Sequence, residues 1–266
     1  MAYISPMLTN IVTAVKKASV NLNRDFSEIE HLQNSVKGSL DFTKIAFDKI
    51  EKGLKIELAK TMPQIPVVLI NDKAPKEGMF LSVSGIEGLA NFAHGNPEFA
   101  ISCALVNGQT VLAGVVYNPA RDELFFAEKG KGAFKEGFRS HERLRVSAKQ
   151  ELEGALVAVK PSANDTELSA KIINNTLAMC HDVRVCGSLA LDLAYVAAGK
   201  LDAVIAPESA LSSMTAGVLL VKEAGGIILD MAQKDTRTED LPMVLNSGNV
   251  MAVSFNLSQK IAKILK

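Results

Sequence analysis

The chain changes character near residue 145, and this change limits the folds that are open to it. Between Phe80 and Phe138, apolar strand-like segments alternate with short turn sequences such as Asn107-Gly108 and Asn118-Pro119. Turns of this kind connect neighbouring antiparallel strands. We therefore predict an antiparallel meander in this part of the chain. Its strands are expected at residues 99–106, 111–117 and 123–127.

Beyond residue 145, predicted strands and helices follow one another in alternation. Strands are expected at residues 156–159, 183–185, 201–205, 227–229 and 251–253, and helices at residues 166–179, 188–198, 214–223 and 257–265. Gly199 and Gly225 come just after two of these helices, where a glycine commonly ends a helix. The alternation favours a layer of the α/β type.

Two amphipathic helices are predicted ahead of the meander, at residues 6–25 and 41–60. Leu8 and Val15 lie on the same face of the first helix, and Pro63 ends the second. Together these elements predict an α/β protein whose N-terminal half is of the α+β type.

The change of pattern also predicts two subdomains, residues 1–145 and residues 146–266. Neither a Gly/Ser-rich segment nor a run of charges separates the two halves in the sequence. Since no linker of either kind stands between them, we expect the subdomains to pack tightly as one unit.

Composition argues against several classes of partner. Lys plus Arg and Asp plus Glu both number 29, so the formal net charge is zero and gives no direct nucleic-acid signature. The apolar runs are shorter than the ~20 residues of a membrane-spanning helix. Residues 1–15 lack the features of a secretory signal, and the three cysteines show no metal-ligand spacing. We therefore expect a cytoplasmic protein with reduced, buried thiols.

Three segments resemble the inositol monophosphatase family. Residues 80–102, FLSVSGIEGLANFAHGNPEFAIS, are similar to its first signature, Asp-Pro-Ile/Leu-Asp-Gly-Thr followed by Thr-Asn-Phe. Residues 114–119 and 127–134 resemble the hairpin that follows. Residues 216–226 are similar to the second signature, which begins Trp-Asp and ends Glu-Ala-Gly-Gly. The order and spacing hold along essentially the whole chain, and the bacterial SuhB-type branch is the most similar.

The resemblance implies a layered α-β-α-β-α sandwich, usually dimeric. In active members it also implies Mg²⁺-dependent hydrolysis of a phosphate monoester. Clustered carboxylates are needed for this reaction because they hold the metal ions that stabilise charge and position the attacking water.

The residues at the motif positions depart from this requirement. The resemblance assigns carboxylates to the positions of Phe47, Ser84 and Ser213. Leu89 stands at the position of the phosphate-facing Thr, and Ala206 at that of the acid that contacts substrate hydroxyls.

Four further motif positions keep some of the family pattern. Glu87 is the one clear carboxylate left, Gly88 retains the glycine, and Ile86 offers a backbone carbonyl. Asn71 and Asp72 align with the Gly-Glu-Glu loop, where a slip of one residue would let Asp72 replace one carboxylate. We expect Mg²⁺ to bind poorly at such a site, with Glu87 as a weak candidate ligand and no catalytic residue assigned.

Two readings of function follow. The first is a catalytically inactive family member that binds a protein partner, in transcription or ribosomal-RNA regulation as the SuhB-type resemblance implies. It requires no cofactor and is expected to form a homodimer. The alternative is a Mg²⁺-dependent phosphatase that hydrolyses inositol 1-phosphate or a related sugar phosphate, using Glu87, Asp72 and the carbonyl of Ile86. A small-molecule or anion sensor that uses the old cleft is the third possibility.

Several acidic and hydroxyl side chains have an alternative role to that of a metal ligand or nucleophile. Glu87 is interpreted as a surface or cleft acid if it binds no metal. Ser84 and Ser213 lack the setting of a serine nucleophile, and a helix-capping role suits Ser213 better. Glu208 and Asp230 are two acids outside the motifs that could also supply metal ligands.

Overall fold

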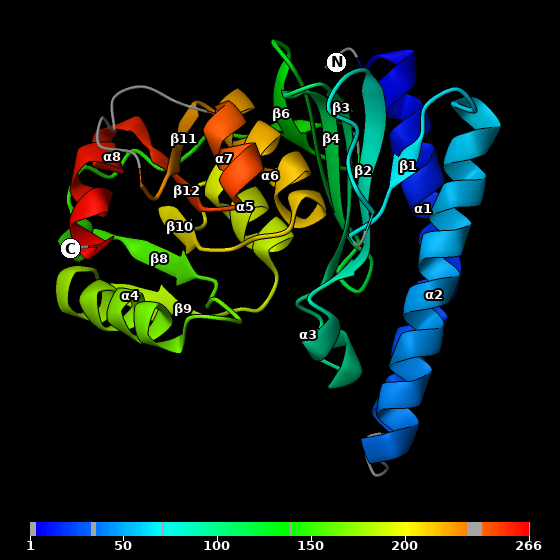
Figure 1. Ribbon diagram of the computed structural model, residues 1–266, viewed down its shortest axis with the longest axis horizontal. Coiled ribbons are helices and arrows are strands. Elements are labelled where there is room, and N and C mark those ends of the chain that lie inside the picture. The colour runs from blue at the N-terminus through cyan, green and yellow to red at the C-terminus, as the bar shows by residue number, and fades with distance from the viewer. Residues whose placement is uncertain (1–3, 33–35, 71, 139, 233–240, 266) are drawn as a thin grey trace.

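The computed structural model describes residues 4–32, 36–70, 72–138, 140–232 and 241–265. It arranges them in five layers, helix, sheet, helix, sheet and helix, which follow one another from right to left in Figure 1. This arrangement confirms the layered α/β sandwich that the sequence predicts. Two of the layers are sheets, one of seven strands and one of five.

The first helical layer is an antiparallel pair, α1 (Pro6–Leu32) and α2 (Val36–Thr61), and both helices extend further than predicted. Their apolar faces bury Leu8, Val15 and Leu54 against one face of the seven-stranded sheet. The opposite faces carry most of the charged residues, which is the pattern of an amphipathic helix on a core.

The seven-stranded sheet contains the predicted meander. Its strands follow chain order: β1 (Val67–Val68), β2 (Met79–Glu87), β3 (Ala100–Asn107), β4 (Thr110–Asn118), β5 (Glu123–Glu128), β6 (Gly132–Lys135) and β7 (Glu142–Arg143). All neighbouring pairs from β2 onward are antiparallel, and only β1 runs parallel to β2. Nearly continuous burial along β2, β3 and β4 shows that both faces of the sheet are covered.

The central layer consists of α5 (Leu189–Ala197) and α6 (Leu211–Glu223), with the short α7 (Leu241–Ser247) beside it. Helix α6 packs on β3, β4 and β5 on one side and on β11 and β12 on the other. Gly114 of β4 permits this close approach, because an added Cβ there would lie 3.0 Å from the Cα of Ala216. As predicted, Gly199 and Gly225 follow the ends of α5 and α6 with left-handed φ angles of 66° and 88°.

The second sheet and its outer helices form the last two layers. Its strands lie in the order β11 (Gly226–Asp230), β12 (Val250–Ser254), β10 (Ala203–Ala206), β8 (Leu156–Val159) and β9 (Asp182–Arg184). The pairs β8–β9 and β8–β10 are parallel, whereas β12 is antiparallel to both of its neighbours. Helices α4 (Thr166–Met179) and α8 (Phe255–Ile261) cover the outer face, with 3₁₀ turns at Leu152–Gly154 and Ala262–Leu265.

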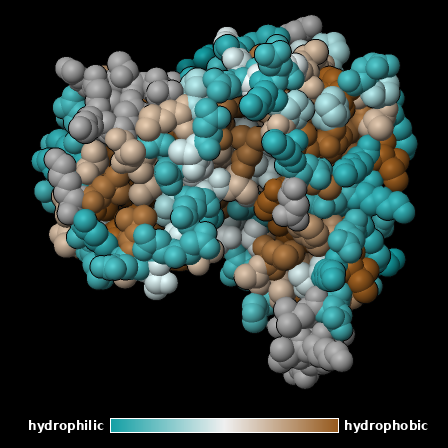
Figure 2. All heavy atoms as spheres, in the orientation of Figure 1, coloured by the Kyte–Doolittle hydropathy of each residue, from teal (hydrophilic) through white to brown (hydrophobic). Residues whose placement is uncertain are grey.

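The surface shown in Figure 2 is mostly hydrophilic, and its apolar side chains lie in separate patches. No helix within the described residues has the length and apolar character to cross a membrane. The cysteines are free thiols, but the expectation of buried thiols holds in full only for Cys103, because Cys180 and Cys186 are only partly buried. The division into residues 1–145 and 146–266 stays a prediction.

Candidate functional site

The motif positions of the first signature lie at the end of β2, where the strand meets the short helix α3 (Leu89–Ala93). The pairing of β2 with β3 is irregular between Ser84 and Glu87, which is the mark of a β-bulge. Gly88 follows with φ of 95°, and an added Cβ there would lie 2.8 Å from the Glu98 carbonyl oxygen. The turn therefore requires glycine, and it carries the chain from the strand into α3.

Glu87 is buried, with 8% of its surface exposed, so the expectation of a surface or cleft acid is wrong. Its carboxylate accepts a hydrogen bond from the Ser188 hydroxyl at 2.5 Å. It also accepts the backbone N–H groups of Leu189 at 3.2 Å and Ala190 at 3.3 Å. These amides are among the donors that a helix leaves unpaired in its first turn. Glu87 therefore serves as a side-chain acceptor for the N-terminus of α5.

Burial and the groups around Glu87 act on its pKa in opposite directions. Burial raises the pKa of Glu87, and the hydrogen bonds from Ser188 and the α5 amides, together with the Lys160 ammonium, oppose that rise. Burial lowers the pKa of Lys160, while the carboxylates of Glu87 and Glu208 act against the decrease. Lys160 is thus a cation of the protein itself beside the retained motif carboxylate.

A second buried carboxyl lies in the first turn of α5. Asp192 is 1% exposed, and its Oδ1 atom has no hydrogen-bond partner among the described residues. Burial and the nearby carboxylates of Glu87 and Glu98 raise the pKa of Asp192 to about 8, against a smaller effect of the Cys186 thiol. Asp192 is therefore mainly protonated at neutral pH. Asp192 was absent from the sequence expectations, although its place in the apolar segment Leu189–Ala197 is a signal that predicts burial.

Ser84 and Ser213 lie in the buried layer between the first sheet and α6. Ser82, two residues before Ser84 and therefore on the same face of β2, lies 3.2 Å from the Thr215 hydroxyl of α6. Ser213 is the third residue of α6 and is buried, and the N-cap position belongs to Ala210. The expected capping role of Ser213 is therefore wrong. Its neighbour Ser212 carries a buried hydroxyl without a partner in the described part of the chain.

The remaining motif positions do not add a ligand to this group. Phe47 packs into the apolar cluster beneath α1 and α2, and Ala206 is fully buried at the end of β10. Leu89 begins α3 with 40% of its surface exposed. Asp72 is exposed, and its carboxylate accepts the Leu69 amide at 3.0 Å within its own turn. Asn71 lies outside the described residues.

The two more distant acids also have other partners. Glu208 is exposed and accepts hydrogen bonds from Ser162 and from Asn164, the latter at 3.1 Å. Asp230 is buried and accepts the Ser247 hydroxyl and the Ala232 amide. Each acid is therefore engaged within its own part of the second sheet.

One carboxylate near β2 was absent from the sequence expectations. Glu51 comes one helical turn after Phe47, and an added Cβ on Gly85 of β2 would lie 2.9 Å from the Glu51 Cγ atom. Its Oε1 atom is buried and has no partner among the described residues. Burial raises the pKa of Glu51, with Lys55 opposing and Asp48 and Asp72 adding to the rise. The spacing of four residues from Phe47 is the signal that could have identified it.

These donors do not fit a Mg²⁺ ion. Mg²⁺ prefers six oxygen ligands in near-octahedral geometry and is usually held through carboxylates. Ser84 and Ser213 offer neutral hydroxyls, and the Glu87 carboxylate already accepts three hydrogen bonds. Within the ranges that the structure describes, no group of three or more His, Cys, Asp or Glu side chains could hold a metal ion.

The five-layer sandwich, with its motif at the end of β2, defines the class of layered α/β proteins. Residues 4–266 match the Inositol monophosphatase family. The chain belongs to this family. Family members are typically Mg²⁺-dependent and often dimeric.

Known relatives carry two different names. An inositol-1-monophosphatase of Rhizobium meliloti (strain 1021) is 37% identical over 268 residues, which cover 98% of this chain and 97% of the relative. The Nus factor SuhB of Escherichia coli (strain K12) is 35% identical over 234 residues, 85% of each chain. The crystal structure of the extragenic suppressor protein suhB from Bartonella henselae superposes with a TM-score of 0.82 at 31% identity, covering 99% of both chains.

Proposed function

We propose that this chain is a member of the inositol monophosphatase family that does not hydrolyse phosphate esters and acts by binding a partner. The observation that carries the proposal is the position of Glu87. In this chain the retained motif carboxylate is buried against the N-terminus of α5 and accepts three hydrogen bonds there. A carboxylate offers about four lone-pair sites. Three of them already accept hydrogen bonds here, which leaves at most one site on Oε1 for a metal ion.

The residues around Glu87 support the same proposal. Burial raises the pKa of Glu87 although the Lys160 ammonium opposes that rise, so the charged form that would bind a metal is disfavoured. Ser84, Ser213 and Ala206 are buried side chains without charge, packed into the layers on either side of α6. Introducing Mg²⁺ among neutral hydroxyls would require it to lose water without gaining strong ligands, which is unfavourable.

A protein partner is the binding role that the relatives support. The name Nus factor SuhB, carried by the Escherichia coli relative, points to a transcription complex. We propose a comparable role in transcription or ribosomal-RNA regulation for this chain, as a cytoplasmic homodimer. Purification of the native complex would test this role. Recovery of transcription-elongation proteins would support it, and a dimer without any specific partner would contradict it.

A Mg²⁺-dependent inositol phosphatase is the second candidate function. The name inositol-1-monophosphatase on the Rhizobium meliloti relative, which matches nearly the full chain, favours this candidate more directly than the first. Glu51 beside Gly85 also favours it, because it places a partly buried carboxylate next to the motif strand. In that case Glu51 would take over a role that the family motif gives to the position of Phe47.

Phosphate release from inositol 1-phosphate, measured over a Mg²⁺ and Mn²⁺ titration, separates the two candidates. The unaltered chain is compared with Glu87→Gln, Glu51→Gln and the double variant Ser84→Asp/Ser213→Asp. We expect no metal-dependent turnover by the unaltered protein. Turnover that is saturable in metal and lost in Glu87→Gln or Glu51→Gln would establish the phosphatase and overturn the first proposal.

A further inference from the structure

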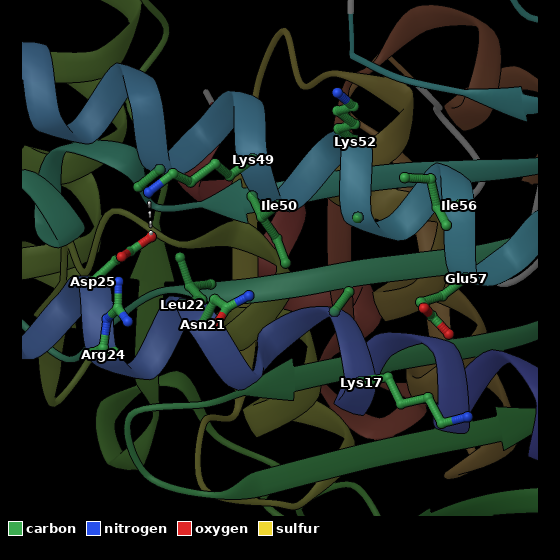
Figure 3. A pocket seen from close by; sticks show the side chains of 13 residues that line it. Lys17, Asn21, Leu22, Arg24, Asp25, Lys49, Ile50, Lys52, Ile56 and Glu57 are labelled. Atoms are coloured by element: carbon green, nitrogen blue, oxygen red, sulfur yellow. Dashed lines mark ion pairs between the residues drawn. The ribbon is translucent and has the colours of Figure 1, made fainter.

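A cavity of about 440 Å³ lies between α1 and α2, in the outer helical layer (Figure 3). None of the motif positions discussed above lines it, so it is distinct from the site at the end of β2. Its volume falls within the range of roughly 300–1,000 Å³ that is usual for small-molecule sites.

Small residues create this cavity. Ala18 of α1 faces Gly53 of α2, and an added Cβ on Gly53 would lie 3.7 Å from the Ala18 Cβ atom. Leu22 and Ile50 are buried beside them and form an apolar floor. Ile56 also lines the cavity, with 49% of its surface exposed. Covering an apolar side chain of this kind is stabilising, because it removes apolar surface from water.

The rim of the cavity carries more positive than negative charge. Lys17, Arg24, Lys49 and Lys52 line it, together with only two carboxylates, Asp25 and Glu57. Asp25 is 3.7 Å from the Lys49 ammonium, and Glu57 is 2.5 Å from Lys60, which does not line the cavity. Both carboxylates are therefore already neutralised. Arg24 in turn pairs with Glu28 at 3.4 Å, so the excess of positive charge lies on Lys17 and Lys52, and it favours an anionic occupant.

Lys17 is the lysine best placed to meet such an anion. Among the described residues, no carboxylate lies within ion-pair distance of Lys17 or Lys52. In Figure 3, Lys52 directs its ammonium away from α1, whereas Lys17 extends along α1 at the end of the cavity where Glu57 lies. Lys49 points towards Asp25 at the opposite end.

The two charged ends leave an apolar stretch between them. Lys17 and Arg24 are seven residues apart on α1, which corresponds to roughly 10 Å along the helix axis. The apolar floor therefore offers room for a short extended hydrocarbon chain.

We propose that this cavity binds an amphiphilic carboxylate, with the hydrocarbon on Leu22, Ile50 and Ile56 and the carboxylate near the Lys17 ammonium. The site combines an apolar floor with a few charged groups at its ends, which is the usual pattern of a small-molecule site. The proposal does not depend on whether the β2 site holds a metal or not.

Isothermal titration calorimetry with decanoate tests the proposal, and decanol serves as a neutral probe of equal length. We expect saturable binding of one decanoate per chain and clearly weaker binding of decanol. Lys17→Gln should weaken decanoate binding roughly two- to fivefold, the usual effect of one exposed ion pair. Lys44→Gln removes the same charge from an exposed position of α2 outside the cavity and should leave binding unchanged.

Filling the cavity gives a second, independent test. Gly53→Leu should abolish binding, and Gly53→Ala should reduce it in a chain that remains folded, because its Cβ meets Ala18 at an ordinary contact distance. Circular dichroism checks the fold of both variants. Absence of saturable decanoate binding, equal affinity for decanol, or full affinity in folded Gly53→Leu would each overturn the proposal. Loss of the dimer in Gly53→Leu, without decanoate binding to the unaltered protein, would assign the cavity to a second copy instead.

Discussion

The hydroxyl of Ser188 donates a 2.5 Å hydrogen bond to the carboxylate of Glu87 and so joins the end of β2 to the beginning of α5. The two residues are far apart in the chain, and both are buried. Because α5 lies between the two sheets, this contact connects the motif strand to the centre of the molecule. A residue that the family motif places in a metal site therefore has a structural role in this chain.

Replacing Glu87 should show this structural role directly. Glu87→Ala removes the acceptor of three hydrogen bonds and leaves the first-turn amides of α5 without a partner. We expect the free energy of unfolding to fall by about 1–3 kcal/mol. Urea denaturation measures the change, with Glu77→Ala as an exposed control. A loss that appears only when Mg²⁺ is present would instead indicate a metal ligand.

Asp192 should make stability depend on pH. Its folded-state pKa of about 8 lies above that of an unfolded Asp, so the folded chain retains a proton that the unfolded chain releases near pH 4. The free energy of unfolding should therefore decrease as pH rises from about 4 to 8, with a slope of up to roughly 1.4 kcal/mol per pH unit. Urea midpoints at pH 5 and pH 8 test this. Asp192→Asn should flatten the dependence, and an unchanged slope in that variant would refute the assignment.

Lys160 and Glu87 should be energetically coupled. Removing the ammonium in Lys160→Met leaves the buried carboxylate without its nearby cation, so the pKa of Glu87 should rise further. A double-mutant cycle with Glu87→Gln should give a coupling energy of roughly 1 kcal/mol. The same cycle between Lys160 and the exposed Glu77 provides the control. Additive effects of Lys160→Met and Glu87→Gln would mean that another charge balances Glu87.

Much of the fold could be predicted from the sequence because local signals were strong. The turns at Asn107-Gly108 and after Asn118 identified the meander, and Gly199 and Gly225 identified two helix ends. Helices α3 and α7 were missed, since segments of five and seven residues are too short to show a helical period.

The candidate site was less accessible to sequence reasoning. The substitutions at the motif positions of Ser84, Leu89 and Ser213 can be read directly from the resemblance. The hydrogen bond between Ser188 and Glu87 could not be predicted from the sequence, because Ser188 comes close to Glu87 only through the packing of α5 on β2. The role of Glu51 likewise depends on its approach to Gly85 across two elements.

Gly114 should tolerate no side chain. Its position in β4 faces α6, where an added Cβ would lie 3.0 Å from the Ala216 Cα and 3.1 Å from the Ala216 carbonyl oxygen. Gly114→Ala should therefore force β4 and α6 apart and cost about 1–3 kcal/mol of stability. Thermal unfolding measures the effect. Gly154→Ala is the matched control, since a Cβ there meets no atom within 4 Å, and an equal loss in both variants would contradict the packing argument.

Restoring carboxylates at two motif positions should expose what the unaltered site lacks. Ser84 and Ser213 are buried, so Ser84→Asp/Ser213→Asp adds two desolvated carboxylates and should lower the melting temperature in the absence of metal. If the new carboxylates converge on an ion, Mg²⁺ or Mn²⁺ should raise that temperature again through binding to the folded state. The unaltered protein should show no such shift at the same metal concentration. A metal-dependent increase in the unaltered protein, absent in Glu87→Gln, would show that its donors hold a metal after all and would favour the phosphatase.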